Sequence, residues 1–405
     1  MRVLLINQFF HPDQAPTSQM MTDLAEDLAA RGIDVTVVSG RSAYTGGKPS
    51  WKRREVYGGI AIHRTWATAF GRKALLGRLL DYASFSLTAA LESLRLPRQD
   101  VVITLSTPPW LFAIGLLLRW MKGTPWVYWV QDIYPDVAIT LGFLRNPGLA
   151  AKGLRRLSKM SFAKADQVVA LGSFMGLRIL ERGGTQEQIT VIPNWADGRR
   201  IYPVASGENW FRAEHGLEGR YVILYSGTMG YVHEFSTSLQ AAKALRHEPH
   251  LLFLFIGDGP RRPEIEAFVG RHGLANVRLL PYQLKEVIPY SLGAGHVHLI
   301  TLKDGLEGLS VPSKIYGSLA AGRPVIYVGP ERSEVGQIVR DAQCGFVVKE
   351  GDVDHLVDAI RTLHQDEALR EEMGRRARAS FELFFDRSIA TERFFKLLET
   401  LSQKR

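Results

Sequence analysis

The sequence is poor in cysteine: Cys344 is the only one among 405 residues. A single thiol excludes a disulfide framework and a cysteine-based metal cluster, and it fits a reducing compartment. Long apolar runs are also missing. The longest, Trp110–Leu118, falls well short of the roughly 20 residues that span a bilayer. Met1–Ile6 is too short for a signal peptide and is expected to be a first strand. The composition, 46% apolar and 22% charged, predicts a soluble globular protein.

Several ligand signatures are absent as well. No G-x-G-x-x-G follows the first expected strand, which argues against a dinucleotide cofactor. No Asp-x-Asp pair stands at the end of an expected strand, so no metal is predicted. No nucleic-acid module or aromatic–basic pattern is found, although the net charge is +9. The positive charge therefore points to phosphates or acidic lipid headgroups as partners, and not to nucleic acid.

The length allows two domains of roughly 150–200 residues each. The N-terminal half alternates apolar β-branched runs with helical periodicity, beginning with a strand, a helix at about Ser18–Arg31 and a second strand. This alternation predicts a parallel, doubly wound sheet of the Rossmann-like kind. The expected strands are Val3–Ile6, Val35–Val38, Val101–Leu105, Trp126–Val130, Val168–Leu171 and Ile189–Ile192.

A second series of the same kind follows a looser stretch, Trp195–Glu218, which is interpreted as a linker. Its expected strands are Val222–Ser226, Leu251–Ile256, Val277–Leu280, Val297–Leu302 and Val325–Val328. The fold class is therefore α/β, with two Rossmann-like doubly wound parallel-sheet domains facing a central cleft. Because ligands of such sheets lie beyond the carboxyl ends of the strands, the Gly-rich loops at these ends are expected to converge on that cleft.

The stretch Asp304–Val328 carries the strongest chemical signal. Its Gly-rich loop holds one carboxylate, Glu307, and the hydroxyls of Ser310 and Ser313, and the cation Lys314 then opens a short helix of small residues. Free backbone N–H groups, the positive end of the helix dipole and a lysine together suit a diphosphate. An ordinary αβ connection with glycine at its C-cap is the alternative.

Motifs along nearly the whole chain give this stretch its context. They are I-N-Q-F-F-H-P-D at Ile6–Asp13, W-V-Q-D-I-Y-P-D at Trp129–Asp136, V-I-P-N-W-A-D at Val191–Asp197, Y-S-G-T-M-G at Tyr225–Gly230, I-G-D-G-P at Ile256–Pro260 and V-P-S-K-I-Y-G-S-L-A-A-G-R-P-V-I at Val311–Ile326. In this order they resemble the retaining GT-B glycosyltransferases of family 4, in the WbuB- and WcaI-like branch of O-antigen and exopolysaccharide assembly.

The resemblance implies an acceptor domain at 1–200, a nucleotide-sugar donor domain at 201–385 and a last helix, 386–405, that crosses back to the first domain. It places Gly227, Thr228, Met229, Gly230 and Lys314 at the diphosphate, and Gly257, Gly259 and Tyr282 near the nucleoside. Glu307 would meet the donor sugar, and Gly308, Leu309, Ser310 and Ser313 would line the same donor site. No metal is implied, and the nucleotide sugar is a co-substrate, so no cofactor is expected.

The chain departs from the family pattern at three places. Gly317 stands where many relatives have a second glutamate that holds the ribose, so ribose recognition is unassigned. Tyr231, Val232 and His233 replace a basic pair, which places more weight on Lys314. Gln131-Asp132 replaces a His-Asp pair, which removes the simplest contact for a sugar hydroxyl.

Three further side chains are candidates. Asp132 follows a buried strand and is expected to orient or deprotonate the acceptor hydroxyl, with the N-cap of the next helix as its alternative role. His11 lies in the first loop, as an acceptor or phosphate contact or as an exposed residue. His233, if protonated, would replace the missing cation.

The segment Phe70–Arg98 combines Arg72, Lys73, Arg78, Arg95 and Arg98 with seven apolar side chains, Leu75, Leu76, Leu79, Leu80, Phe85, Leu87 and Leu91. Such a basic amphipathic helix is typical of an anionic membrane surface, and equally of a helix packed on its own sheet with a solvated basic edge.

The sequence is thus interpreted as a glycosyltransferase that moves a sugar from a nucleotide-sugar donor to a lipid-linked saccharide in cell-surface polysaccharide biosynthesis. The donor is expected to be UDP-linked rather than GDP-linked, with retained anomeric configuration. The expected location is cytoplasmic, peripheral on the inner face of the cytoplasmic membrane. Two alternatives stay open: a GT-B-fold UDP-sugar 2-epimerase, and a non-catalytic nucleotide-sugar-binding scaffold.

Overall fold

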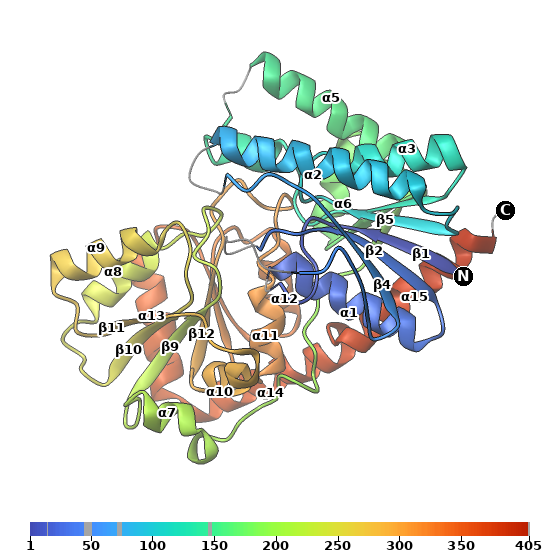
Figure 1. Ribbon diagram of the computed structural model, residues 1–405. Helices are drawn as coiled ribbons and strands as arrows, with labels where there is room; N and C mark the ends of the chain where they lie inside the picture. The colour runs from blue at the N-terminus through green and yellow to red at the C-terminus, as the bar shows by residue number, and fades with distance from the viewer. Residues whose placement is uncertain (14, 44–50, 71–74, 145–147, 404–405) are drawn as a thin grey trace. The chain divides into compact units, whose positions relative to one another are not determined.

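The computed structural model describes residues 1–13, 15–43, 51–70, 75–144 and 148–403. The chain divides into two compact units, one of Met1–Pro193 with Ile389–Arg405 and the other of Asn194–Ser388. Figure 1 shows helices and strands alternating along the chain in both units.

The first unit contains an eight-stranded sheet in the order β3-β4-β2-β1-β5-β6-β7-β8. Neighbouring strands are parallel except β3, which pairs antiparallel with β4. The strands are β1 (Arg2–Ile6), β2 (Asp34–Gly40), β3 (Arg54–Tyr57), β4 (Ile60–Thr65), β5 (Val101–Leu105), β6 (Trp126–Trp129), β7 (Gln167–Ala170) and β8 (Ile189–Val191).

Helices cover both faces of this sheet. In Figure 1, α2 and α3 lie over one face, with α5 beyond them, and α1 and α15 lie over the other. The helices are α1 (Pro16–Ala30), α2 (Leu75–Arg95), α3 (Phe112–Lys122), α4 (Asp136–Thr140), α5 (Leu149–Lys164), α6 (Ser173–Glu181) and α15 (Arg387–Gln403), with the 3-10 turn η1 (Gln186–Gln188). All five residues of β5 are buried, as expected for a parallel strand covered on both faces.

The last helix, α15, packs within the first unit although it follows the whole of the second in sequence. The rings of Phe394 and Trp129 lie 4.7 Å apart between centroids, and Glu392 forms an ion pair with Arg31 at 2.6 Å. The chain therefore returns to its first unit after completing the second.

The second unit contains a six-stranded, wholly parallel sheet in the order β11-β10-β9-β12-β13-β14. Its strands are β9 (Tyr221–Ser226), β10 (Leu251–Ile256), β11 (Val277–Leu280), β12 (Val297–Thr301), β13 (Val325–Val328) and β14 (Gly345–Val348). Its helices are α7 (Trp210–Glu214), α8 (Ser236–Ala244), α9 (Arg262–His272), α10 (Ile288–Gly293), α11 (Lys314–Ala320), α12 (Glu334–Asp341), α13 (Val353–Gln365) and α14 (Glu367–Phe384), with 3-10 turns η2 (Ser206–Glu208) and η3 (Lys285–Val287).

Two cores hold this second unit together, one on each face of its sheet. Residues of α8, α9 and α13 pack on one face of the strands, including Leu239, Ile265 and Ile360. Residues of α7, α10 and the end of α11 pack on the other. The expected α/β architecture of two parallel-sheet domains is confirmed.

The structure also corrects details of the sequence interpretation. The short strands β3, β4 and β14 were not expected, and β3 breaks the parallel pattern. Trp195–Glu218 is not a linker: it belongs to the second unit, where Phe211 and Leu217 are fully buried in the core beside α10. The glycine, proline and charged residues of this stretch suggested a linker, although it contains two large apolar core residues.

Candidate active site

The candidate site lies at the carboxyl edge of the second sheet, where the strand order reverses. Strand β9 is flanked by β10 on one side and β12 on the other. Such a reversal opens a crevice between the loops that follow the diverging strands, and ligands of doubly wound sheets bind there. The loops after β9, β10 and β12 contain most of the residues that the sequence assigns to donor binding.

Glycines allow the first two of these loops to touch backbone to backbone. A Cβ on Gly257 would lie 2.2 Å from the carbonyl oxygen of Gly227, and one on Gly259 would lie 2.5 Å from that of Met229. Gly227, Gly257 and Gly259 also adopt φ values of 130°, 137° and 151°, which favour glycine. These positions therefore need glycine for close approach as well as for backbone conformation.

The hydrogen bonds of these loops narrow the expected phosphate contacts. The Gly227 amide donates to the carbonyl of Ile256 at 2.8 Å, and the Met229 amide to that of Asp258 at 2.8 Å. These two amides are committed to the protein. Within Gly227–Gly230, the amides of Thr228 and Gly230 are the better candidates for a phosphate oxygen.

Tyr282 and Tyr225 hold Thr228 from two sides. The Tyr282 hydroxyl lies 2.8 Å from the Thr228 hydroxyl and 3.1 Å from the Asp258 carbonyl. The Tyr225 hydroxyl donates to the carbonyl of Thr228 at 2.8 Å. Tyr282 thus belongs to the same cluster as the first two loops, as its sequence position suggested, and nearly half of it is exposed for contact with a ligand.

Lys314 joins this cluster from the start of α11. A Cβ on Gly227 would meet its Cε at 2.9 Å, so the lysine stem lies directly against the first loop. Its Nζ lies 5.0 Å from the centroid of the Tyr225 ring, within range of a cation–π interaction. The residue keeps some exposed surface, but burial of the amine lowers the pKa of Lys314 to about 7.

His233 is the main surprise of the site. Its ring is buried, its Nδ1 lies 2.7 Å from the carbonyl oxygen of Thr301, and its Nε2 lies 2.7 Å from Lys314 Nζ. Burial, together with the charges of Lys314 and Arg261, holds the pKa of His233 well below its usual value. These partners and the lowered pKa favour a neutral ring, and not the protonated His233 that the sequence offered as a replacement cation.

The loop before α11 places the remaining candidates. Gly308 turns at φ 69°, and Gly308, Leu309 and Ser310 are buried, whereas Ser313 is exposed at the N-cap of α11. Glu307 is half-buried. Ser310 and Ser313 therefore face different surroundings, although the sequence assigned them the same role.

Asp132 belongs to the first unit, at the end of β6. The amides of Gln131 and Asp132 donate to the Ser106 hydroxyl at 2.9 and 3.2 Å, which fixes this turn to the end of the neighbouring strand β5. Asp132 does not cap the following helix, because Pro135 occupies the N-cap of α4. Burial and the charge of Asp132 together raise the pKa of Tyr128. In the same unit, His11 is half-buried and stacks on the Tyr57 ring at 3.8 Å, so it is not simply exposed.

The basic amphipathic segment forms α2, but several of its leucines are exposed to solvent and its acidic residues are buried. Of its expected residues, Arg72 and Lys73 and the side chains of Leu75, Leu76 and Arg78 lie outside what the structure describes. Leu80, Leu87 and Leu91 share one helical face and are 46%, 63% and 47% exposed. The acidic residues Asp81 and Glu92 are buried instead.

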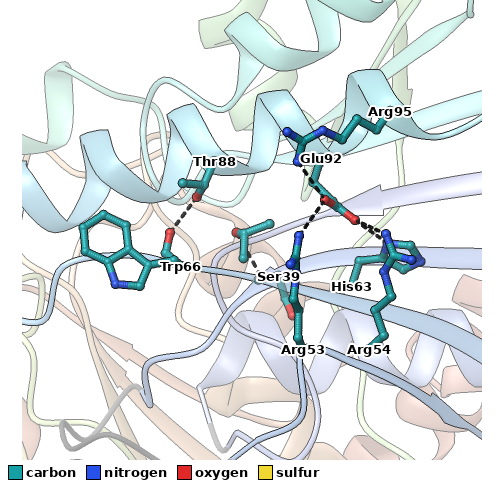
Figure 2. A network of polar contacts seen from close by, with 9 residues as sticks. Ser39, Arg53, Arg54, His63, Trp66, Thr88, Glu92 and Arg95 are labelled. Atoms are coloured by element: carbon teal, nitrogen blue, oxygen red, sulfur yellow. Dashed lines mark hydrogen bonds and ion pairs between the residues drawn. The ribbon is translucent and has the colours of Figure 1, made fainter.

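A basic cluster surrounds the buried carboxylate of Glu92 (Figure 2). His63 lies 2.8 Å from it, Arg54 3.2 Å, Arg95 3.7 Å and Arg53 3.9 Å. The hydrogen bond from His63 is the main reason that the pKa of Glu92 lies below its usual value. Because one carboxylate faces three guanidinium groups that are each about two-thirds exposed, this end of α2 carries net positive charge.

Two features are absent from the described residues. None of their helices is both long enough and apolar enough to cross a membrane. In the same part of the chain, no three side chains of the His, Cys, Asp and Glu types are grouped so that they could hold a metal ion.

Comparison with known families agrees with this arrangement. Residues 17–195 match the family described as glycosyl transferase 4-like domain, and residues 208–380 match glycosyl transferases group 1. The two matches correspond to the two units and together cover most of the chain. The chain therefore belongs to the GT-B glycosyltransferases of family 4, as the motif order indicated.

Two relatives by sequence and one solved structure show the extent of the similarity. WbjE of Pseudomonas aeruginosa, described as a probable glycosyltransferase, is 30% identical over 62% of this chain and 63% of its own. WcaI of Escherichia coli strain K12, described as a colanic acid biosynthesis glycosyl transferase, is 26% identical over 84% of this chain and 86% of its own. Among solved structures, HepE of Anabaena in complex with UDP and glucose superposes with a TM-score of 0.76 at 16% identity, over 99% of this chain and 100% of its own.

Proposed function

We propose that this chain transfers a sugar from a UDP-linked donor to a lipid-linked saccharide, with retention of configuration, in cell-surface polysaccharide biosynthesis. The observation that carries the donor assignment is Lys314, whose stem lies against the Gly227 loop at the point where the strand order reverses. The HepE complex with UDP and glucose supports a UDP-linked donor for a chain of this fold. The description of WcaI supports a polysaccharide product.

The chemistry follows from charge. When the bond between the anomeric carbon and the diphosphate breaks, negative charge grows on the leaving oxygen and positive charge on the sugar. The leaving diphosphate would be stabilised by Lys314, by the amides of Thr228 and Gly230, and by the hydroxyls of Ser310 and Ser313. Glu307 would bind a sugar hydroxyl and stabilise the positive centre. This residue set needs no metal ion and no cofactor.

The acceptor step is assigned to the first unit. Asp132, fixed through Ser106 at the end of β6, would orient the acceptor hydroxyl. In a retaining reaction the leaving diphosphate can itself accept the hydroxyl proton, so the proposal does not require Asp132 to act as the base. A 2-epimerase would instead release free sugar and nucleotide without any acceptor, and a scaffold would bind the donor without turnover.

Thermal stabilisation by a panel of UDP-, GDP-, dTDP- and ADP-sugars tests the donor assignment. A ligand at about 100 times its Kd stabilises the native protein by roughly 2.7 kcal/mol. We expect UDP-sugars to raise the melting temperature of the wild type and to have little effect on Lys314→Ala. An equal shift in Lys314→Ala would place the ligand elsewhere, and no shift with any nucleotide sugar would refute the donor assignment.

We further propose that α2 rests on an anionic membrane, on the cytoplasmic side, where a lipid-linked acceptor would lie. The support is the exposed leucine face beside the basic cluster of Arg53, Arg54 and Arg95, since apolar side chains with flanking cations suit an anionic bilayer surface. The acidic residues of the same helix, Asp81 and Glu92, are buried, so they place no exposed carboxylate beside these leucines.

Flotation with lipid vesicles tests this surface. Burying a leucine is worth about 1.5–3 kcal/mol, so Leu87→Ser with Leu91→Ser should lower binding to phosphatidylglycerol vesicles at least about tenfold. The matched control is Leu383→Ser, which removes an equally exposed leucine from α14 of the other unit. Binding that survives the double change, or that is equal on neutral phosphatidylcholine vesicles, would contradict the proposed surface.

A further inference from the structure

The hydrogen-bond partners of His233 define its tautomer. Nδ1 faces the carbonyl oxygen of Thr301 at 2.7 Å, and a carbonyl can only accept, so Nδ1 carries the proton. In the neutral ring Nε2 is then an acceptor. It faces Lys314 Nζ at 2.7 Å, so the lysine donates to it.

A second proton on this ring would break the arrangement. Nε2–H would then point at the lysine ammonium, and two donors would face each other at hydrogen-bond distance. The groups that contact the pair directly add no negative charge: Tyr225 of β9 and Thr301 of β12 are neutral. The charges that lower the pKa of His233 are those of Lys314 and of Arg261, at the start of α9, and Arg261 is itself paired with Glu264 at 2.6 Å. Arg261 also donates to the backbone carbonyl of His233, which fixes the loop. Both the ring and its surroundings therefore favour a single positive charge on the pair, carried by Lys314.

A neutral acceptor has a consequence that a carboxylate would not have. A carboxylate at this position would hold Lys314 by ion pairing and would cancel much of its charge toward a third group. An imidazole holds the amine through one hydrogen bond and leaves its charge uncancelled. The stem of Lys314 is meanwhile confined by the backbone of Gly227 and the ring of Tyr225.

We propose that His233 is a positioning residue, whose neutral imidazole holds the Lys314 ammonium at the Gly227 loop with its charge available for the donor diphosphate. This inference rests on the proposed donor site. It also gives His233 the opposite role to that of a substitute cation: it acts through Lys314 and does not bind the phosphate itself.

The expected pH dependence follows from the lysine. Its pKa of about 7 means that the amine loses its charge as the pH rises through neutrality. Affinity for a diphosphate should therefore fall above about pH 7 in the wild type, approaching tenfold per pH unit. Removing the acceptor should lower the lysine pKa further and move this decline to lower pH by about one unit, because a hydrogen bond to a charged group is lost.

The test compares wild type, His233→Gln and His233→Leu, with UDP as the probe, from pH 5.5 to 8.5. Glutamine keeps an oxygen acceptor and leucine keeps only the volume. UDP ionises identically in all three titrations, so any difference between the three profiles comes from the interaction between Lys314 and residue 233. We expect the decline of His233→Gln to follow the wild type, and that of His233→Leu to move to lower pH, with affinity partly recovered in acid.

A ligand-free measurement separates the inference from the donor assignment. In ¹⁵N-histidine NMR, His233 should show the neutral form protonated at Nδ1 throughout this pH range, whether or not UDP binds. A ring that becomes positively charged near pH 6.5, or a His233→Leu profile identical to that of the wild type, would overturn the inference. A wild type that binds no UDP while its His233 shows the expected tautomer would refute the donor site, and with it the role of the pair in phosphate binding.

Discussion

Replacing Lys314 with methionine is expected to lower the rate of sugar transfer by about 10²–10³-fold, the usual cost of losing one preorganised group that stabilises developing charge. Methionine keeps most of the length of the stem against Gly227 and loses only the ammonium. The effect should be large because the amine is held in place by His233 and Tyr225 before the donor arrives. A flexible surface lysine would contribute far less.

The measurement is the initial rate of nucleotide release with the donor that the stabilisation panel identifies, at pH 6.5, where most of the wild-type lysine is charged. Lys285→Met is the matched control, because Lys285 is exposed in the turn η3. It should retain wild-type rates. A Lys314→Met enzyme within about threefold of the wild type would remove Lys314 from the catalytic group, whereas an equal loss in both variants would indicate a general effect of charge.

Raising the pH should reproduce part of this loss in the wild type. The charged form of Lys314 predominates below its pKa of about 7 and declines above it. Transfer at low donor concentration should therefore fall between pH 7 and 8.5 in the wild type, and Lys314→Met should show no such step. The mutant profile thus separates titration of Lys314 from titration of the acceptor or of other side chains.

Most of the fold was predictable because the strands of parallel sheets are continuous apolar runs. β10 is buried along all six residues, and its bounds were predicted to the residue. β3 was not predicted, because it is a four-residue edge strand with alternating exposure, and its pattern is weak without its partner β4. The segment Trp195–Glu218 was misinterpreted because its two large anchors, Phe211 and Leu217, are spaced too irregularly to indicate a core helix.

The candidate site was predictable in its types of residue and less so in its interactions. Glycines at strand ends and a lysine at a helix start give a signal in sequence, because few positions need such residues. The neutral state of His233 gives none, because it depends on Thr301 and Lys314, which lie 68 and 81 residues away along the chain. The amides of Gly227 and Met229 likewise donate to carbonyl groups of β10 and of the loop after it, and these hydrogen bonds cannot be read from the sequence around Gly227.

Gly257→Ala should destabilise the second unit by about 3–5 kcal/mol. The added methyl would lie 2.2 Å from the Gly227 carbonyl oxygen, and φ is 137°, so a steric clash and backbone strain both act. The contact atom belongs to the backbone and cannot rotate away. The two loops must therefore separate, which would carry Gly227 away from Lys314 and weaken UDP binding even in the protein that remains folded.

Thermal and urea unfolding, with UDP binding measured on the folded fraction, test this prediction. Gly270→Ala is the matched control, since Gly270 lies inside α9 and its added methyl would meet no atom within 4 Å. Alanine should stabilise that helix by about 0.5–1 kcal/mol. If Gly257→Ala unfolds at the same temperature and urea concentration as the wild type, the close contact between the loops does not exist in solution. If it is destabilised but binds UDP normally, the spacing of Gly227 and Lys314 does not set donor affinity. Loss of both, with Gly270→Ala unaffected in binding, would show that the packing of the two glycine loops builds the diphosphate site.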